Sequence, residues 1–308
     1  NALVDGTNST YIGWYAAYNQ THGDNNVVIG HQALYGSSGK GDLSENVAIG
    51  YQSGYKAEAG YGITAVGSRA LRNITPSGSL STAIGYFSGF NSSGSYNTFV
   101  GAEAGRGGTT SAPFSSGANN TAVGYEALYS FTTGYNNTAM GYKALYAATT
   151  AYQNIAVGDN AMRYLTTGLW NVSIGNNSGP AEMGSRIVAI GELAGRFNKG
   201  TGNVHIGYRA GFQVSGSHNI TIGHQAGYGG TSSAPYSTGT SNIGIGQSAL
   251  AAFTTGYQNV AVGGYAGDAI NTGYNNTIMG QSAGTNLTTG HSNVIIGRVA
   301  GYATTDVD

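Results

Sequence analysis

The chain has 308 residues, of which 53 are Gly, 4 are Pro and only 8% are charged. Because Gly does not recur at every third position and Pro is scarce, the chain is not collagen. Its 40% hydrophobic residues and 23 Tyr exclude intrinsic disorder. The 12 Lys and Arg and 13 Asp and Glu give a net charge of −1, which provides no basic stripe for nucleic acid or anionic lipid. We therefore expect no nucleic-acid partner.

Cys is absent, which excludes disulfides, thiolate metal sites and Cys nucleophiles. No apolar run approaches the ~18 residues of a membrane-spanning helix, so we expect no membrane insertion by this segment. The six His are scattered without the spacing of a metal site. We expect neither a metal nor a cofactor.

An apolar residue followed by Gly recurs from end to end in 17 repeats. We call this Gly the anchor glycine. Consecutive anchor glycines are mostly 16 or 17 residues apart, with one step of 18, one of 20 and two of 23. A repeat this short cannot hold a pair of helices. A β-branched residue three before each anchor glycine and Ile, Val or Met one before it predict a short strand. In chain order the predicted strands are 10–12, 27–29, 47–49, 64–66, 82–84, 98–100, 121–123, 138–140, 155–157, 172–174, 188–190, 204–206, 220–222, 243–245, 260–262, 277–279 and 294–296.

Ala or Ser stands three residues after every anchor glycine, which predicts a second strand close across a thin interior. The predicted fold is all-β, a parallel β-solenoid or β-roll of about 17 rungs with 16–17-residue repeats. Residues two before the anchor glycine, such as Val28, Ala48 and Phe99, are expected to face outward. They would form an exposed apolar row that another subunit should cover, so we expect a homotrimer or a filament subunit.

A block of seven repeats is duplicated at an offset of 122 residues. Each copy carries nearly the same insert, Gly107–Phe114 in one and Gly229–Tyr236 in the other. No shift in composition marks a linker, so we predict a single continuous solenoid domain over residues 1–308.

Asn stands four residues before the anchor glycine in 13 of the 17 repeats. Stacked at one turn, these side chains would form an amide ladder, and the anchor glycines would allow the tight turn after each strand. The structural residues that we single out are Gly124, Gly141, Gly158, Gly175, Asn120, Asn137, Asn154 and Asn171.

Aromatic residues precede the Asn turn and are the candidate ligand contacts. Rigid amphipathic rings in a row can pack against sugars or proteins, or they can stack on one another from rung to rung. The candidates are Tyr96, Tyr135, Tyr152, Trp170, Tyr257 and Tyr274.

A carboxylate pair could be formed by Glu103 and Glu126, two residues after consecutive anchor glycines. The same row also holds Gln, Arg and Lys, as a solvated row does, so we expect no catalytic residues and no enzyme.

The segments Asn46–Ser53 and Asn137–Ala144 resemble the head repeats of trimeric autotransporter adhesins, and 132–139 is similar to repeats of phage tail fibres and bacterial surface fibre proteins. The resemblance covers about residues 7 to 303. It implies a left-handed parallel β-roll, a trimer of three chains and a role in attachment. The present repeat is longer than the usual adhesin head repeat, so one turn is longer.

Two functions remain open. The chain could be the shaft or head of a surface adhesin or tail fibre that attaches to a cell-surface carbohydrate or protein. Alternatively, it could be a purely structural subunit that polymerises into an extracellular filament. A glycan-active enzyme is a distant third alternative. The first two functions place the chain outside the cell, at a cell surface or on a virion, with itself as its main partner.

Overall fold

The computed structural model describes residues 7–20, 22–36, 43–57, 60–75, 79–108, 114–230 and 236–302. Residues 109–113 and 231–235, which make up most of the two predicted inserts, lie outside this range. The chain divides into two compact units, Asn1–Asn154 and Ile155–Asp308, which we call the N-terminal and C-terminal units. The prediction of one continuous domain stays a prediction.

The described part of the N-terminal unit contains a parallel sheet in which β1, β2, β4, β6, β7, β8, β9 and β10 pair in that order. A separate parallel pair is formed by β3 and β5. The strands are β1 (Thr10–Ile12), β2 (Val27–Ile29), β3 (Leu43–Ser44), β4 (Val47–Ile49), β5 (Gly60–Tyr61), β6 (Thr64–Val66), β7 (Thr82–Ile84), β8 (Thr98–Val100), β9 (Thr121–Val123) and β10 (Thr138–Met140).

In the C-terminal unit, β11 to β19 pair in parallel in chain order. The register places equal repeat positions side by side, as in Val172 with Val188 and Ile174 with Ile190. The strands are β11 (Ile155–Val157), β12 (Val172–Ile174), β13 (Val188–Ile190), β14 (Val204–Ile206), β15 (Ile220–Ile222), β16 (Ile243–Ile245), β17 (Val260–Val262), β18 (Thr277–Met279) and β19 (Val294–Ile296).

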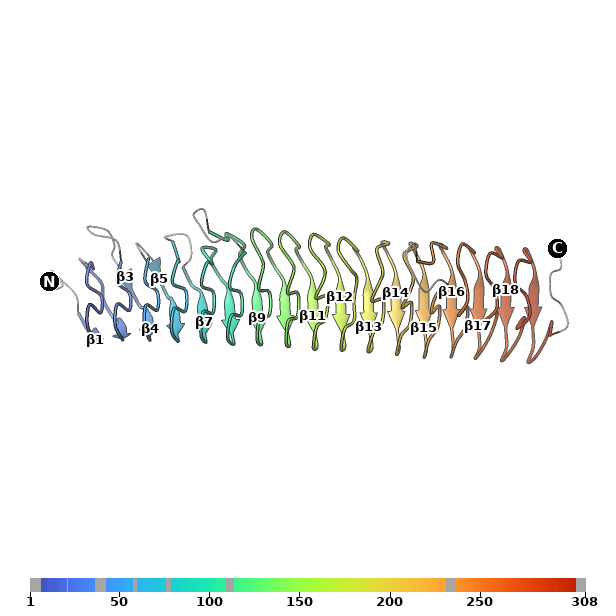
Figure 1. The fold of residues 1–308 in the computed structure, drawn as a ribbon, viewed down its shortest axis with the longest axis horizontal. Coiled ribbons are helices and arrows are strands. Elements are labelled where there is room, and N and C mark those ends of the chain that lie inside the picture. The colour runs from blue at the N-terminus through green and yellow to red at the C-terminus, as the bar shows by residue number, and fades with distance from the viewer. Residues whose placement is uncertain are drawn as a thin grey trace. The chain divides into compact units, whose positions relative to one another are not determined.

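The predicted fold class is confirmed: the described residues contain no helix, and in each unit successive coils of mostly 16 or 17 residues stack as a parallel β-solenoid (Figure 1). The predicted second strand across the interior is wrong. Left-handed residues two and four after the anchor glycine, such as Glu126 (φ 53°) and Leu128 (φ 52°), make this side a series of turns. These turns still bond from coil to coil, because the amide of Leu128 donates to the carbonyl of Ala144 at 2.9 Å.

The predicted direction of the strand side chains is also wrong. The residue two before the anchor glycine faces inward, and Val28, Ala48 and Phe99 are fully buried. The β-branched residues on either side of it face outward instead. The reason is the thinness of the interior, which accommodates this one position opposite the buried Ala or Ser of the turn side.

The anchor glycines cannot be replaced by another residue without strain. Their φ angles lie between 124° and 138°, a region that L-residues with a Cβ rarely adopt. A Cβ on Gly124 would lie 2.5 Å from the carbonyl oxygen of Gly141 in the next coil. These glycines therefore serve both the turn and the close stacking of coils.

Two coils show how the volumes of two core positions compensate each other. Where the inward strand residue is Ala122, the residue four after the anchor glycine is the buried Leu128. Where the strand residue is the larger Phe99, that partner is Gly105, and a Cβ on Gly105 would overlap the Phe99 ring. Gly105 and Leu128 share the left-handed conformation, with φ of 56° and 52°, so space determines which residue fits.

We expect Gly105→Leu to destabilise the chain strongly, because the new side chain has no room beside Phe99. Phe99→Ala alone leaves a cavity and should cost about 3–5 kcal/mol. The double variant recreates the Ala122–Leu128 pairing and should be more stable than either single variant. Urea unfolding followed by circular dichroism measures the free energy of unfolding of each variant. If the losses of the two single variants added up in the double variant, the proposed pairing would be wrong.

Candidate functional site

The outward sheet face is the surface formed by the side chains three and one before each anchor glycine. In the C-terminal unit this face is apolar except for Thr277, and Ile174 (42% exposed), Ile245 (37%) and Met279 (43%) are open to solvent. In the N-terminal unit one of its two rows is richer in Thr. Five consecutive coils carry Thr there: Thr64, Thr82, Thr98, Thr121 and Thr138.

The size of the outward sheet face in one unit is similar to that of the largest apolar patch on a typical monomer. With strands ~4.8 Å apart and three residues long, eight paired strands cover about 400 Å² in projection. The largest apolar patch on a typical monomer measures about 300–600 Å². No charged residue lies on this face in the strands of either unit. The feature that distinguishes this face is therefore its continuous, uncharged surface rather than its area.

The Asn residues four before the anchor glycine form a buried hydrogen-bonded ladder. Asn137 Oδ1 accepts from the amide of Asn154 at 3.1 Å and from Asn154 Nδ2 at 3.1 Å. Asn137 Nδ2 donates to the carbonyl of Ala151 at 2.8 Å, in the turn of the next coil. In the same way, Asn120 Nδ2 donates to the carbonyl of Gly134. In the C-terminal unit, Asn171 Nδ2 donates to the carbonyl of Gly184. The ladder thus satisfies turn groups that would otherwise be buried without partners.

The predicted aromatic residues lie at the surface next to this ladder. Tyr135 and Tyr152 stack with centroids 5.0 Å apart and planes at 5°, and Tyr257 and Tyr274 stack at 4.9 Å and 5°. The guanidinium of Arg186 lies 4.7 Å from the ring centroid of Trp170. Tyr96 is 58% exposed. That these six residues contact a ligand stays a prediction.

Sequence reasoning missed a second column of rings, five residues after successive anchor glycines in the N-terminal unit. Two arginines interrupt the rings: Arg72 lies over Tyr55 at 4.8 Å, and Arg106 lies over Tyr129 at 5.2 Å. All members are half-buried. The sequence pattern that could have predicted this column is an aromatic residue or Arg at the position five after each anchor glycine of this unit. The column consists of Tyr18, Tyr35, Tyr55, Arg72, Phe90, Arg106, Tyr129 and Tyr146.

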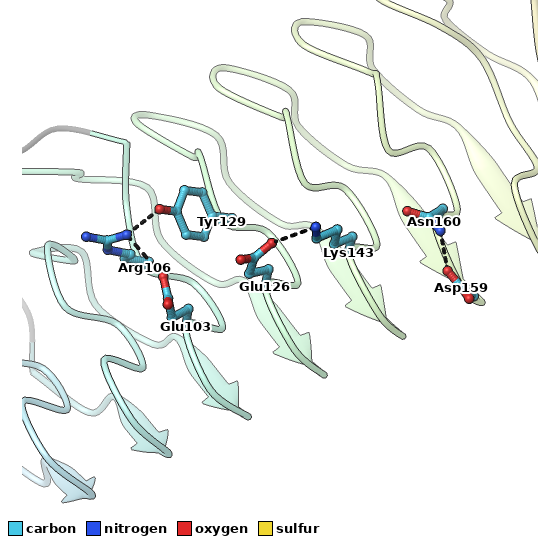
Figure 2. A network of polar contacts seen from close by, with 7 residues as sticks. All are labelled: Glu103, Arg106, Glu126, Tyr129, Lys143, Asp159 and Asn160. Atoms are coloured by element: carbon cyan, nitrogen blue, oxygen red, sulfur yellow. Dashed lines mark hydrogen bonds and ion pairs between the residues drawn. The ribbon is translucent and has the colours of Figure 1, made fainter.

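The two carboxylates considered as a catalytic pair each have a cation of their own. Glu103 pairs with Arg106 at 3.0 Å, and Glu126 pairs with Lys143 at 3.3 Å (Figure 2). The Arg106 guanidinium also donates to the hydroxyl of Tyr129. Tyr142 and then Glu126 raise the pKa of Lys143 by accepting hydrogen bonds from its ammonium group. This arrangement neutralises both carboxylates and cross-links neighbouring coils.

A fully buried histidine, His205, replaces the usual small inward residue of β14. Asn198 Oδ1 accepts from Gly200 and Asn203, so its Nδ2 donates to His205 Nε2 at 2.6 Å. His205 Nδ1 therefore carries the proton and donates to Thr221 Oγ1 at 2.7 Å. Burial lowers the pKa of His205 to about 3, which keeps the ring neutral.

Within the described ranges, no group of three or more His, Asp or Glu could hold a metal ion, and no helix is long and apolar enough to cross a membrane. No family model matches the chain, and no curated protein matches it. The outward sheet face and the aromatic rows are the candidate interaction surfaces.

We expect Asn137→Ala to destabilise the N-terminal unit by about 2–4 kcal/mol, because the carbonyl of Ala151 and the backbone amide of Asn154 each lose the hydrogen bond that Asn137 provides. Asn136→Gly is the control, since Asn136 is exposed and its φ of 55° suits Gly. Chemical unfolding measures both variants. Equal stability of the two would refute a structural role for the ladder.

We also expect acid to weaken the coil around His205. The pKa of His205 in the folded chain lies below the unfolded value of ~6.5. The stability that depends on a neutral His205 is therefore fully present above pH 6.5 and is lost as pH falls towards 3. Between pH 6.5 and 4.5 the free energy of unfolding should fall by about 2–3 kcal/mol. His205→Thr should remove this part of the pH dependence, although the variant is less stable at pH 7. If the free energy of unfolding of this variant fell with pH as steeply as that of the wild type, His205 would not be the group responsible.

Proposed function

We propose that the chain is a structural and adhesive element of an extracellular fibre, the shaft or head of a surface adhesin or phage tail fibre. Copies of the chain associate through the outward sheet face, in a homotrimer. The observation that carries this proposal is the apolar character of that face, on which residues such as Ile174 and Met279 are more than 40% exposed. The parallel β-solenoid supports a fibre-like role.

A second copy is the occupant that fits the outward sheet face best. The face repeats the same apolar side chains at the same spacing, so it is complementary to itself along the coils. It carries no charge that would select a partner of opposite charge. Burying the exposed Val and Ile side chains of this face contributes about 25 cal/mol of free energy for each Å² of apolar surface removed from water. Association would complete the core that a single thin coil lacks.

The aromatic rows support a role as shaft more than direct stacking on sugars. A sugar ring packs on a free aromatic face, but Tyr135 and Tyr152 cover each other's faces, as do Tyr257 and Tyr274. Tyr135 and Tyr257 are 42% and 39% exposed, so each pair has an edge open to solvent. Attachment to a cell-surface protein or glycan through this edge would use hydrogen bonds rather than ring stacking.

The alternative function is a subunit that polymerises end to end into an extracellular filament. The regular register of the coils favours it, because identical repeat positions can also pair between chains. Electron microscopy separates the two: rods of one length support the trimer, and long unbranched filaments support polymerisation.

We expect Ile174→Lys combined with Ile245→Lys to convert a trimer into monomers, because the charges would be buried at the interface. Sedimentation equilibrium measures the mass, and circular dichroism checks that both variants keep the β-solenoid. Asn176→Lys, two residues beyond Ile174 on the exposed turn, is the matched control and should stay trimeric. A monomeric wild-type chain would overturn the proposal.

A further inference from the structure

The stacked tyrosine pairs next to the Asn ladder have a geometry that suits covalent coupling. Tyr135 and Tyr152 occupy the same position in consecutive coils, and Tyr257 and Tyr274 occupy it 122 residues further on. Both pairs have ring centroids within 5.0 Å and planes at 5°. Tyr135 is 42% and Tyr257 39% exposed, so an oxidant in solution can reach each pair.

The backbone holds each pair in register. The amide of Gln153 donates to the carbonyl of Tyr135 at 3.0 Å, and the amide of Asn275 donates to that of Tyr257 at 3.1 Å. The two rings of a pair therefore stay side by side at the spacing of adjacent coils. Carbon–carbon coupling then requires the two rings of a pair to turn about their side-chain bonds.

We propose that Tyr135–Tyr152 and Tyr257–Tyr274 are sites of dityrosine cross-linking under a one-electron oxidant such as a haem peroxidase with hydrogen peroxide. Each phenol loses one electron and one proton, which gives two tyrosyl radicals. The radicals join through a carbon–carbon bond between ring positions next to the hydroxyls, and each of these carbons then passes its hydrogen to the phenol oxygen. The pair loses two hydrogens, and one hydrogen peroxide becomes two waters.

The product would connect consecutive coils covalently within one chain. It would close a loop of 17 residues between the linked positions and so restrict the unfolded chain, as a disulfide does. This inference does not depend on the proposed function, because it requires only that the coils stack as they do within each unit.

The experiment treats the dilute full-length chain with peroxidase and hydrogen peroxide, then measures dityrosine fluorescence and maps linked peptides by mass spectrometry. We expect links between Tyr135 and Tyr152 and between Tyr257 and Tyr274, within single chains and independent of protein concentration. Tyr135→Phe and Tyr257→Phe keep the stacked rings but should each abolish one link. The oxidised wild type should unfold at a higher temperature than the oxidised double variant.

Tyr61 and Tyr96 provide the internal control, since they are 55% and 58% exposed and the structure, where described, stacks neither on another tyrosine. Tyr96→Phe should leave the yield unchanged. Links distributed by exposure, with Tyr61 and Tyr96 joined between chains as readily as the stacked pairs within them, would overturn the proposal. So would an equal yield of the two predicted links from the urea-unfolded chain.

Discussion

The thickness of the coil interior controls the rest of this structure. Each coil buries one strand residue together with several residues from the turn side, and Ala122, Ala127, Leu128 and Phe131 of one coil are all fully buried. The large strand residue Phe99 is accommodated because the residue four after its anchor glycine is Gly105, whereas in the coil of Val28 that residue is Leu34. Where both residues are small, as with Ala48 and Gly54, a neighbouring coil fills the space, because a Cβ on Gly54 would lie 3.1 Å from the Leu34 side chain of the preceding coil.

The same thinness explains why the large aliphatic residues lie outside. A strand has two faces, and when the inner one can hold only small or compensated side chains, Val and Ile must occupy the outer one. A thin coil also buries a smaller share of its apolar surface than a globular domain of equal length. Its stability therefore depends on backbone hydrogen bonds between coils, on the Asn ladder and on whatever covers the outward sheet face.

The sequence was sufficient to predict the period, the fold class and the strand before each anchor glycine, because this glycine and the β-branched residues recur at fixed spacing. It missed the short pair β3 and β5. It could not tell which strand face is buried, since a period of two relates side chains to one another but not to the interior. The turn side was mistaken for a strand because left-handed φ at Glu126 and Leu128 has no signature in those residue types. The buried contacts of His205 likewise required the neighbouring coils to be known.

Residues that depart from the repeat specify which coils stack on each other, which identical repeats cannot do. If all coils were alike, coils of one chain could pair with coils of another in any register, which is a known route to misassembly in repeat proteins. The Asn ladder alone would permit this, although Ile63 and Ile187 interrupt it. Contacts between coils such as His205 with Thr221, and Glu126 with Lys143, require a particular residue in the neighbouring coil. A shift by one coil would keep most backbone bonds but would lose these matches, so the irregular positions specify the register that the regular ones leave open.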